Sequence, residues 1–369
     1  MNIVSKGILY TGTAGTPRAV ASFPTVTSLG GTRLLATFRV GTGKDSEDEQ
    51  VECCASDDGG ATWSEPWRPF GNVVDGVVGS LKVVYVTRLS GGALFATTMW
   101  VDRTSFAGKP LFNEETQGCL PARILVAESV DQGTTWSQWR PVETPARLGP
   151  PSLTSPALLF PSGRIAISVE SNKHYLDTSP WLQRVEYICS ADGGKSWPES
   201  QLVCADSGGR LFHWDQRAGV TPDGRIVTFT WLYDSVAGKY LEIERRISSD
   251  EGRTWSAPEP LGISDQPSRP AIFPDGRLVL AWVDRYGSQS IRARAARSAE
   301  GRLEQEVTLY DAAGPAAAYR DTGELLVDMG AWTYGLPYAE ALPDGDAMVV
   351  WYGGNPASTS IHWARLRAE

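Results

Sequence analysis

One eight-residue pattern, S-x-D-x-G-x-[T/S]-W, occurs four times in this chain of 369 residues. Each copy has five restricted positions, so four copies indicate repeated structural units rather than chance. The Asp can accept hydrogen bonds from its own turn, the Gly can adopt a positive φ, and the Thr or Ser and the Trp can begin a strand. The octet therefore predicts a turn between strands, with structural Asp residues. The four copies are Ser56–Trp63, Ser129–Trp136, Ser190–Trp197 and Ser248–Trp255.

A second repeat is a tight, Gly-containing turn between two apolar runs, and it occurs six times. Turns such as Pro-Asp-Gly between apolar segments are typical of β-hairpins. The two repeats alternate along the chain, so each unit reads as four strands. Six such units predict an all-β fold, a six-bladed β-propeller. The six turns are Leu29–Thr32, Ser90–Ala93, Pro161–Arg164, Pro222–Arg225, Pro274–Arg277 and Pro343–Asp346.

The two ends of the chain complete one another in this scheme. The fifth unit has a worn octet, Ser298–Arg302, which lacks the Trp, and the sixth ends with the strand Ser360–Arg365 and has no fourth strand. The strand-like segment Asn2–Thr11 is expected to supply that strand and close the ring, which removes an open sheet edge. We therefore expect a single propeller domain over residues 1–369. Long loops are expected at 102–118, 171–183 and 312–332.

Composition excludes several classes of function. The formal net charge is -9, which argues against a nucleic-acid partner. No long apolar run suggests a membrane span, and the first residues lack the apolar core of a signal peptide. The five Cys are odd in number, and their spacings fit neither a zinc site nor a disulfide framework. We expect reduced, buried cysteines, a cytoplasmic protein, and no metal or cofactor; the oligomeric state is not predicted.

The octets and the six-unit arrangement resemble the sialidase superfamily, whose Asp-box repeats have this form, and the resemblance covers nearly the whole chain. A sialidase holds the sugar carboxylate with three Arg and uses a Tyr–Glu nucleophile pair and an Asp acid/base. The resemblance implies that Arg39 binds the carboxylate, Asp45 is the acid/base and Tyr338 is the nucleophile. Ser22-Phe23-Pro24 stands where the family has Arg-Ile-Pro, so the first Arg of the triad is missing.

Propeller geometry selects further candidates, because inner strands begin and second strands end at the same mouth. Asp215, or alternatively Asp234, could stand in for the Glu that partners Tyr338. Arg269 and Arg285 could hold a carboxylate, and His213 could be a general base because it titrates near neutrality. Further residues expected to contact substrate at this mouth are Trp214, Glu340 and His174.

Three functions remain open from the sequence, and all of them have a carbohydrate as partner. The first is a sialidase-like glycoside hydrolase that acts on a terminal, acidic sugar. The second is a polysaccharide lyase in which His213 and Tyr338 abstract the proton beside a uronate carboxylate. The third is a non-catalytic carbohydrate-binding propeller, favoured by the missing Arg and by the 14 Trp. The fold alone does not decide among them.

Overall fold

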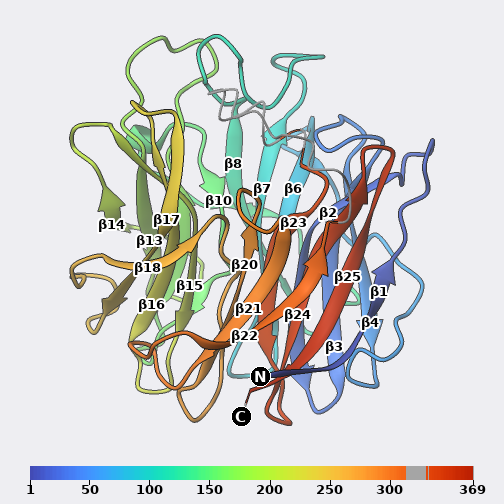
Figure 1. The fold of residues 1–369 in the computed structure, drawn as a ribbon. Coiled ribbons are helices and arrows are strands. Elements are labelled where there is room, and N and C mark those ends of the chain that lie inside the picture. The colour runs from blue at the N-terminus through green and yellow to red at the C-terminus, as the bar shows by residue number, and fades with distance from the viewer. Residues whose placement is uncertain (313–329, 331, 369) are drawn as a thin grey trace.

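The computed structural model describes residues 1–312, 330 and 332–368, so most of the predicted loop 312–332 lies outside the described residues. Its regular structure is almost entirely strand, with a short 3₁₀ turn at Ala146–Leu148. Figure 1 shows upright sheets arranged around the molecule as in a propeller, with both chain termini at the lower end. The prediction of an all-β, propeller-like fold is confirmed.

The strands form five hydrogen-bonded sheets. One sheet has seven strands: β23 (Gly335–Ala341), β24 (Asp346–Asn355), β25 (Ser358–Arg367), β1 (Asn2–Tyr10), β2 (Val20–Gly30), β3 (Arg33–Gly41) and β4 (Gln50–Ser56). The next contains β5 (Val73–Val74), β6 (Val77–Arg88), β7 (Leu94–Asp102), β8 (Ala122–Ser129) and β9 (Arg140–Pro141). The third contains β10 (Ser152–Leu153), β11 (Leu158–Leu159), β12 (Ile165–Glu170), β13 (Arg184–Ser190) and β14 (Glu199–Ala205). The fourth sheet contains β15 (Leu211–Val220), β16 (Ile226–Asp234), β17 (Lys239–Ser248) and β18 (Glu259–Ser264). The fifth contains β19 (Ala271–Ile272), β20 (Leu278–Asp284), β21 (Ser290–Ala296) and β22 (Glu304–Asp311).

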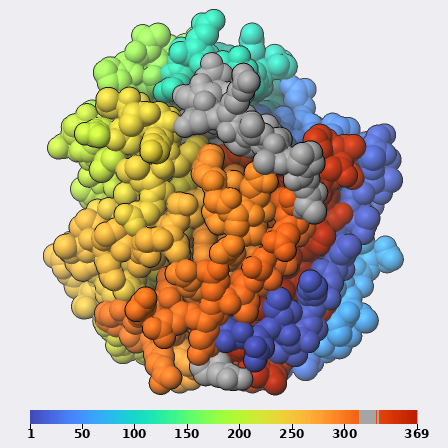
Figure 2. All heavy atoms as spheres, in the orientation of Figure 1, coloured from blue at the N-terminus to red at the C-terminus, as the bar shows by residue number. Residues whose placement is uncertain are grey.

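The seven-stranded sheet differs from the prediction of six separate blades. A single parallel residue pair, Val20 with Thr359, connects β2 to β25 and merges two groups of strands into one hydrogen-bonded sheet. Within it, β1 pairs antiparallel with β25, from Asn2 opposite Arg367 to Tyr10 opposite Ile361. The N-terminal strand therefore completes the last group of strands, as predicted, and Figure 2 shows the blue N-terminal residues beside the red C-terminal ones.

The octet turns have the hydrogen bonds that the sequence predicts. In all four copies the Ser hydroxyl accepts the Gly N–H at 2.9 Å. The same hydroxyl donates to the Asp carboxylate at 2.7 or 2.8 Å. The Thr or Ser two residues after the Gly donates its backbone N–H to that carboxylate at 2.8 or 2.9 Å. Bonds from the Thr62 and Thr135 side chains lower the pKa of Asp58 and Asp131 to about 2, as expected of structural acceptors.

Two of the octets also join their sheet to the preceding one. At Gly133 and Gly194 the φ angles are 88° and 84°, which favours Gly. A Cβ at Gly133 would lie 2.7 Å from Leu35 in β3, and one at Gly194 would lie 2.9 Å from Phe95 in β7. These turns therefore pack directly on a side chain of the neighbouring sheet, and a larger residue would separate the two sheets.

A different set of hydrogen bonds holds the worn octet of the fifth unit. Arg245 of β17 is buried and donates to the carbonyls of Ala299, Glu300 and Gly301 at 2.7 to 2.9 Å. Its guanidinium also pairs with Glu259 at 2.7 Å. Because three turn carbonyls share one cation from the preceding sheet, Arg245 holds this turn by bonds that differ from those of the intact octets.

Burial agrees with the strand pattern. One cluster joins Val227 and Phe229 of β16 to Leu278 and Leu280 of β20, so the core fills the space between adjacent sheets. All five cysteines are buried and outside any disulfide. In the part of the chain that the structure describes, no helix has the length and apolar character needed to cross a bilayer.

Replacement of Arg245 tests the junction at the worn octet. Arg245→Met keeps the length of the side chain and removes its donors, leaving three turn carbonyls without their partner. We expect a loss of about 2–4 kcal/mol in the free energy of unfolding, measured by urea denaturation. Arg302→Met, in the same turn but 89% exposed, is the control and should change stability by less than about 0.5 kcal/mol. Equal effects of the two variants would contradict this role of Arg245.

Candidate functional site

A cavity of about 140 Å³ lies where the inner strands begin, and we call it the mouth cavity. It draws side chains from all five sheets or their adjoining loops and combines aromatic, acidic and basic groups. Such a mixture of apolar walls and a few convergent polar groups is typical of small-molecule sites. Its polar and aromatic lining residues are Phe23, Lys44, Lys82, Tyr85, Phe112, Ser152, Thr154, Glu170, Trp214, Asp215, Arg217, Gln266, Trp332 and Tyr352.

β-bulges turn several of these side chains into the cavity. The register of β2, β6, β15 and β23 shifts at Phe23, Lys82, Asp215 and Leu336, and all four residues line the mouth cavity. Phe23, Asp215 and Leu336 have φ angles of 51°, 47° and 49°, which non-Gly residues rarely adopt. A bulge re-aims a side chain at local conformational cost, and such strain concentrates at functional sites.

Two carboxyl groups from neighbouring sheets meet in the mouth cavity. Glu170 ends β12 and is 1% exposed, and its Oε1 accepts the backbone N–H of Gln216 at 3.0 Å. Asp215 lies in the β15 bulge; its Oδ1 accepts from Arg217 Nη2 at 3.1 Å and its Oδ2 accepts from the Gln266 amide. Gln216 thus links the peptide that carries Asp215 to the Glu170 carboxyl, which fixes the two acids relative to each other.

The environments of the two acids separate their protonation states. Burial, followed by the negative charge of Asp215, raises the pKa of Glu170 to about 8, and the Gln216 N–H and Arg217 offset only part of this rise. Asp215 has an ion pair with Arg217, and its side chain is 18% exposed. At neutral pH Glu170 therefore holds a proton beside Asp215, which is ion-paired with Arg217, and a protonated carboxyl group is what general acid catalysis requires.

Arg217 and two Tyr form the floor of the cavity. Arg217 is buried and donates to the hydroxyl of Tyr85 and to the carbonyl of Thr154. The ring of Tyr85 lies over that of Tyr338, with centroids 6.1 Å apart. A throat of only about 10 Å³ at this level separates the mouth cavity from a lower cavity of about 230 Å³. The mouth cavity is therefore a closed-ended pocket.

A Lys–Tyr contact forms part of the wall. Lys44 Nζ donates to the Tyr352 hydroxyl at 2.8 Å and to the Trp332 carbonyl at 3.1 Å. Burial lowers the pKa of Lys44 well below its usual range, and Arg285 and Arg39 lower it further. Burial raises the pKa of Tyr352 to about 12. This wall favours a bound negative charge, which would stabilise the Lys44 ammonium.

The structure brings only part of the predicted site together. Asp215 and Trp214 line the mouth cavity, as predicted. His213 does not: it is buried, Gln183 bonds its backbone, and its Nδ1 has no hydrogen-bond partner among the described residues. Burial lowers the pKa of His213 to about 4. His174 is exposed in the loop after β12, at a bridge to Cys119, and is likewise absent from the described lining.

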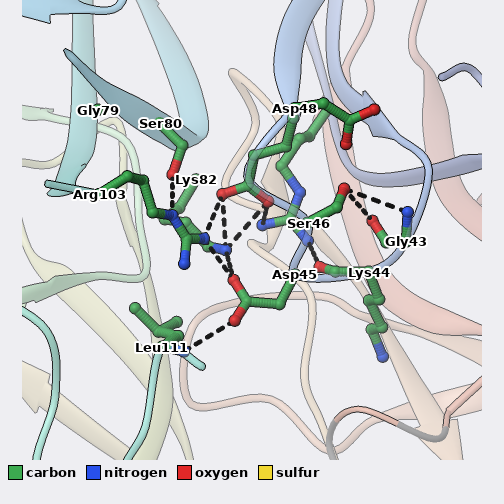
Figure 3. A network of polar contacts seen from close by, with 12 residues as sticks. Gly43, Lys44, Asp45, Ser46, Asp48, Gly79, Ser80, Lys82, Arg103 and Leu111 are labelled. Atoms are coloured by element: carbon green, nitrogen blue, oxygen red, sulfur yellow. Dashed lines mark hydrogen bonds and ion pairs between the residues drawn. The ribbon is translucent and has the colours of Figure 1, made fainter. Parts of the chain in front are cut away.

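Asp45 belongs to a charge network beside the mouth cavity (Figure 3). Its carboxylate pairs with Lys82 and Arg103 and accepts the Leu111 backbone N–H at 2.8 Å. Burial raises the pKa of Asp45, but Lys82 and Arg103 outweigh that effect and hold it well below its usual range. The predicted acid/base residue is therefore ionised within this network beside the mouth cavity, and its catalytic role stays a prediction.

Three predicted residues lie one layer too deep. Tyr338, Arg269 and Glu340 line the lower cavity, where Arg269 pairs with Glu340 and lies over the Tyr338 ring. Burial raises the pKa of Tyr338, which opposes formation of a nucleophilic tyrosinate. Tyr338 directly follows the β-bulge of β23, and this shift in register places its side chain at the floor rather than in the mouth cavity.

The remaining predicted residues are engaged in ion pairs. Arg39 pairs with Glu49 at 3.2 Å and Arg285 pairs with Asp265 at 2.8 Å, all four being buried. Neither Arg appears in the described lining of the mouth cavity, although Arg285 lies 3.7 Å from the centre of the Trp332 ring. Their positive charges lower the pKa of Lys44, which lines the mouth cavity.

Sequence reasoning named Glu170 only as the end of a second strand at the mouth and gave it no role, and it did not select Arg217, Lys44 or Tyr352. Glu170 was recognisable as the polar end of an otherwise apolar second strand, Ile165–Glu170. Tyr352 occupies a similar position in β24, before two Gly. Nothing in the sequence marks Lys44 or Arg217, because their roles depend on loop and bulge geometry. Among the described residues, no group of three or more His, Cys, Asp or Glu is placed to hold a metal ion.

Comparison with solved structures gives matches over the whole chain. A protein of unknown function from Dyadobacter fermentans is 20% identical and has a TM-score of 0.75; the match covers 100% of this chain and 99% of that one. The intramolecular trans-sialidase from Ruminococcus gnavus, solved with oseltamivir carboxylate, is 14% identical with a TM-score of 0.66, over 100% and 98% of the two chains. An α-L-arabinanase from Penicillium chrysogenum, complexed with arabinobiose, is 15% identical with a TM-score of 0.67, over 100% and 99%. No protein-family model and no curated protein matches this chain.

The pH dependence of stability tests the environment of Glu170. The folded chain keeps the Glu170 proton up to a pKa of about 8, whereas the unfolded chain loses it near the ordinary value of 4.5. The free energy of unfolding therefore falls as pH rises through this window. Glu170→Gln removes this pH-dependent contribution to stability. The free energy of unfolding of the variant, relative to that of wild type, should therefore increase between pH 5 and pH 8 by on the order of 1–4 kcal/mol.

Urea denaturation of both proteins at these two pH values measures the difference. Glu115→Gln, an exposed replacement of the same chemistry, is the control and should show no such trend. A constant difference between the Glu170→Gln variant and wild type at both pH values would contradict the raised pKa.

Proposed function

We propose that this chain, which has the sialidase-like propeller fold, is a glycoside hydrolase whose chemistry is performed by Glu170 and Asp215. The observation that supports it most strongly is the buried carboxyl pair at the mouth, in which one acid retains its proton and the other is ionised. Glycoside hydrolases generally use two carboxyl groups in this way, one as acid and one as nucleophile or base.

The proposed roles follow from the contacts. Glu170 donates its proton to the glycosidic oxygen as the bond from that oxygen to the anomeric carbon breaks. Asp215 stabilises the positive charge that develops at the anomeric carbon and either attacks it or removes a proton from the attacking water. Arg217 and Gln266 hold Asp215, and the Gln216 N–H holds Glu170, so neither acid needs to reorient during the reaction.

The shape and charge of the mouth cavity support a terminal, acidic sugar as substrate. The Tyr85–Tyr338 layer forms the floor, so a terminal sugar can enter from the mouth and occupy the cavity beside Glu170 and Asp215. The basic residues of the described lining are Lys44, Lys82 and Arg217; Lys82 pairs with Asp45 and Glu49, and Arg217 pairs with Asp215. Burial lowers the pKa of Lys44, and a carboxylate on the sugar would stabilise its ammonium form.

The two alternatives from the sequence have less support. The lyase required His213 and Tyr338 beside one carbon, but His213 is outside the described lining of the mouth cavity and Tyr338 forms its floor. A purely binding propeller has no need of a buried carboxyl group such as Glu170, whose desolvation costs stability at neutral pH.

We also infer that the propeller has six blades. The seven-stranded sheet counts as two blades, β2–β4 and β23–β25 with β1, because only the Val20–Thr359 pair links them. The sheets β5–β9, β10–β14, β15–β18 and β19–β22 supply the other four. This count matches the six Gly-turn repeats of the sequence.

A hydrolysis screen tests the proposed activity. The panel contains 4-methylumbelliferyl glycosides of sialic, glucuronic and galacturonic acids and of neutral arabinose and galactose, in both anomeric forms where these exist. We expect turnover of an acidic member, with kcat reduced about 10²–10⁴-fold in both Glu170→Gln and Asp215→Asn. Because the acid must be protonated, kcat/KM should fall as pH rises above about 8.

Asp234→Asn is the matched control, because Asp234 was the alternative to Asp215 and pairs with Arg210 at 2.6 Å outside the described cavity lining. It should leave kcat within a factor of about three. Full activity in Glu170→Gln, or no turnover on any member, would contradict the proposed function. Preference for a neutral sugar would retain the hydrolase and reject the acidic substrate.

A further inference from the structure

A second cavity adjoins the mouth cavity, and we call it the outer cavity. Its volume is about 430 Å³, and five residues line both cavities, so the two are continuous. The outer cavity lies between the loop after β3 and the loop that joins β7 to β8. The shared residues are Phe23, Lys44, Lys82, Leu111 and Phe112.

The described walls of the outer cavity are apolar where they are free to contact a ligand. Phe23, Pro110, Leu111 and Phe112 supply aromatic and aliphatic surface. Glu114 is exposed at the rim. Removal of water from such surface favours binding of an apolar group by about 25 cal/mol per Å².

Three charged groups of the described lining, Lys82, Asp45 and Arg39, are engaged in ion pairs, and Lys44 bonds Tyr352 and the Trp332 carbonyl. Lys82 bonds Asp45 and Glu49, and Glu49 also pairs with Arg39 and Arg103 (Figure 3). Hydroxyl groups of a sugar placed here would lose water without gaining equivalent partners, which is costly. An occupant without hydroxyl groups would not incur that loss.

The apolar wall is held in place by the same network. The Leu111 backbone N–H donates to Asp45 at 2.8 Å, and the Gly108 N–H donates to Glu47 at 2.9 Å, so two bonds fix the β7–β8 loop to the loop after β3. The ring of Phe106 packs on Tyr175 at a centroid distance of 4.7 Å. The apolar wall is therefore preformed, which lowers the entropic cost of binding.

We infer that the outer cavity binds the leaving group of the substrate, and that this group is an apolar, aromatic or alkyl aglycone rather than a second sugar. This inference rests on the proposed function, because it assigns the sugar to the mouth cavity beside Glu170 and Asp215. The bond to be broken then lies at the junction of the two cavities, and the aglycone contacts Leu111 and Phe112. The natural substrate belongs to the class of small-molecule glycosides.

Two measurements test the inference. The first compares kcat/KM for methyl, butyl and hexyl glycosides of the sugar that the screen selects, with a disaccharide of the same terminal sugar. Each methylene buried in the outer cavity should raise kcat/KM about three- to fourfold until the cavity is filled. The second measures binding of 4-methylumbelliferone alone by calorimetry, which needs neither sugar nor turnover.

Leu111→Asn places a polar group of similar size in the wall and should weaken 4-methylumbelliferone binding about tenfold. Leu176→Asn is the matched control, because Leu176 is 68% exposed and outside the described lining of both cavities. It should leave binding unchanged. Leu111→Asn should also flatten the chain-length series.

The outcomes separate this inference from the proposed function. Turnover that prefers the disaccharide, or that does not change with chain length, rejects the apolar aglycone and keeps the hydrolase. Binding of 4-methylumbelliferone that depends on Leu111, without turnover of any glycoside, supports the apolar site and rejects the hydrolase. Absence of both turnover and 4-methylumbelliferone binding rejects both.

Discussion

The burial of Glu170 beside an ionised Asp215 is the interaction on which this site depends. Two carboxyl groups that are close and poorly solvated cannot both ionise, so one of them keeps its proton at neutral pH. Arg217 and Gln266 stabilise the charge on Asp215, and burial decides that Glu170 is the acid. A Tyr nucleophile is not required in this arrangement. The same fold can therefore support a chemistry different from that of the sialidases it resembles.

Rigidity of the surrounding sheets makes this arrangement possible. The octet turns fix each sheet to its neighbour through Gly residues that leave no room for a side chain. The bulges at Phe23, Lys82, Asp215 and Leu336 then direct one side chain from each of four inner strands into a common cavity. Because the sheets cannot move apart, the strain in these bulges is retained and the side chains keep their positions.

The repeat pattern was sufficient to predict the strands, the turns and the pairing of the N-terminal strand with the last one. These features depend on local residue types, such as the Asp and Gly of each octet, and local rules apply to them. The single Val20–Thr359 pair that merges two predicted blades into one sheet is a long-range contact with no local signal.

The site was harder to predict, because a bulge changes which residue faces the mouth. Asp215 was identified correctly as a cavity residue, since it sits at the start of an inner strand. Tyr338 has an equivalent sequence position, but the bulge at Leu336 and Pro337 moves it down to the floor. Lys44 lies in the loop after β3, and Glu170 is the buried last residue of β12. No sequence motif marks either position as part of the site. Family resemblance did not indicate the ion pairs of Asp45 with Lys82 and Arg103, and the acid/base role that it implies for Asp45 stays a prediction.

A direct titration of Glu170 would test the central claim. Carboxyl-¹³C NMR of protein labelled at Glu, with Glu170→Gln used for assignment, gives the pKa of this group without any substrate. The account predicts a titration near pH 8 in the wild type, shifted to lower pH in Asp215→Asn, where the neighbouring charge is removed. A titration near pH 4.5 that is unaffected by Asp215→Asn would contradict it.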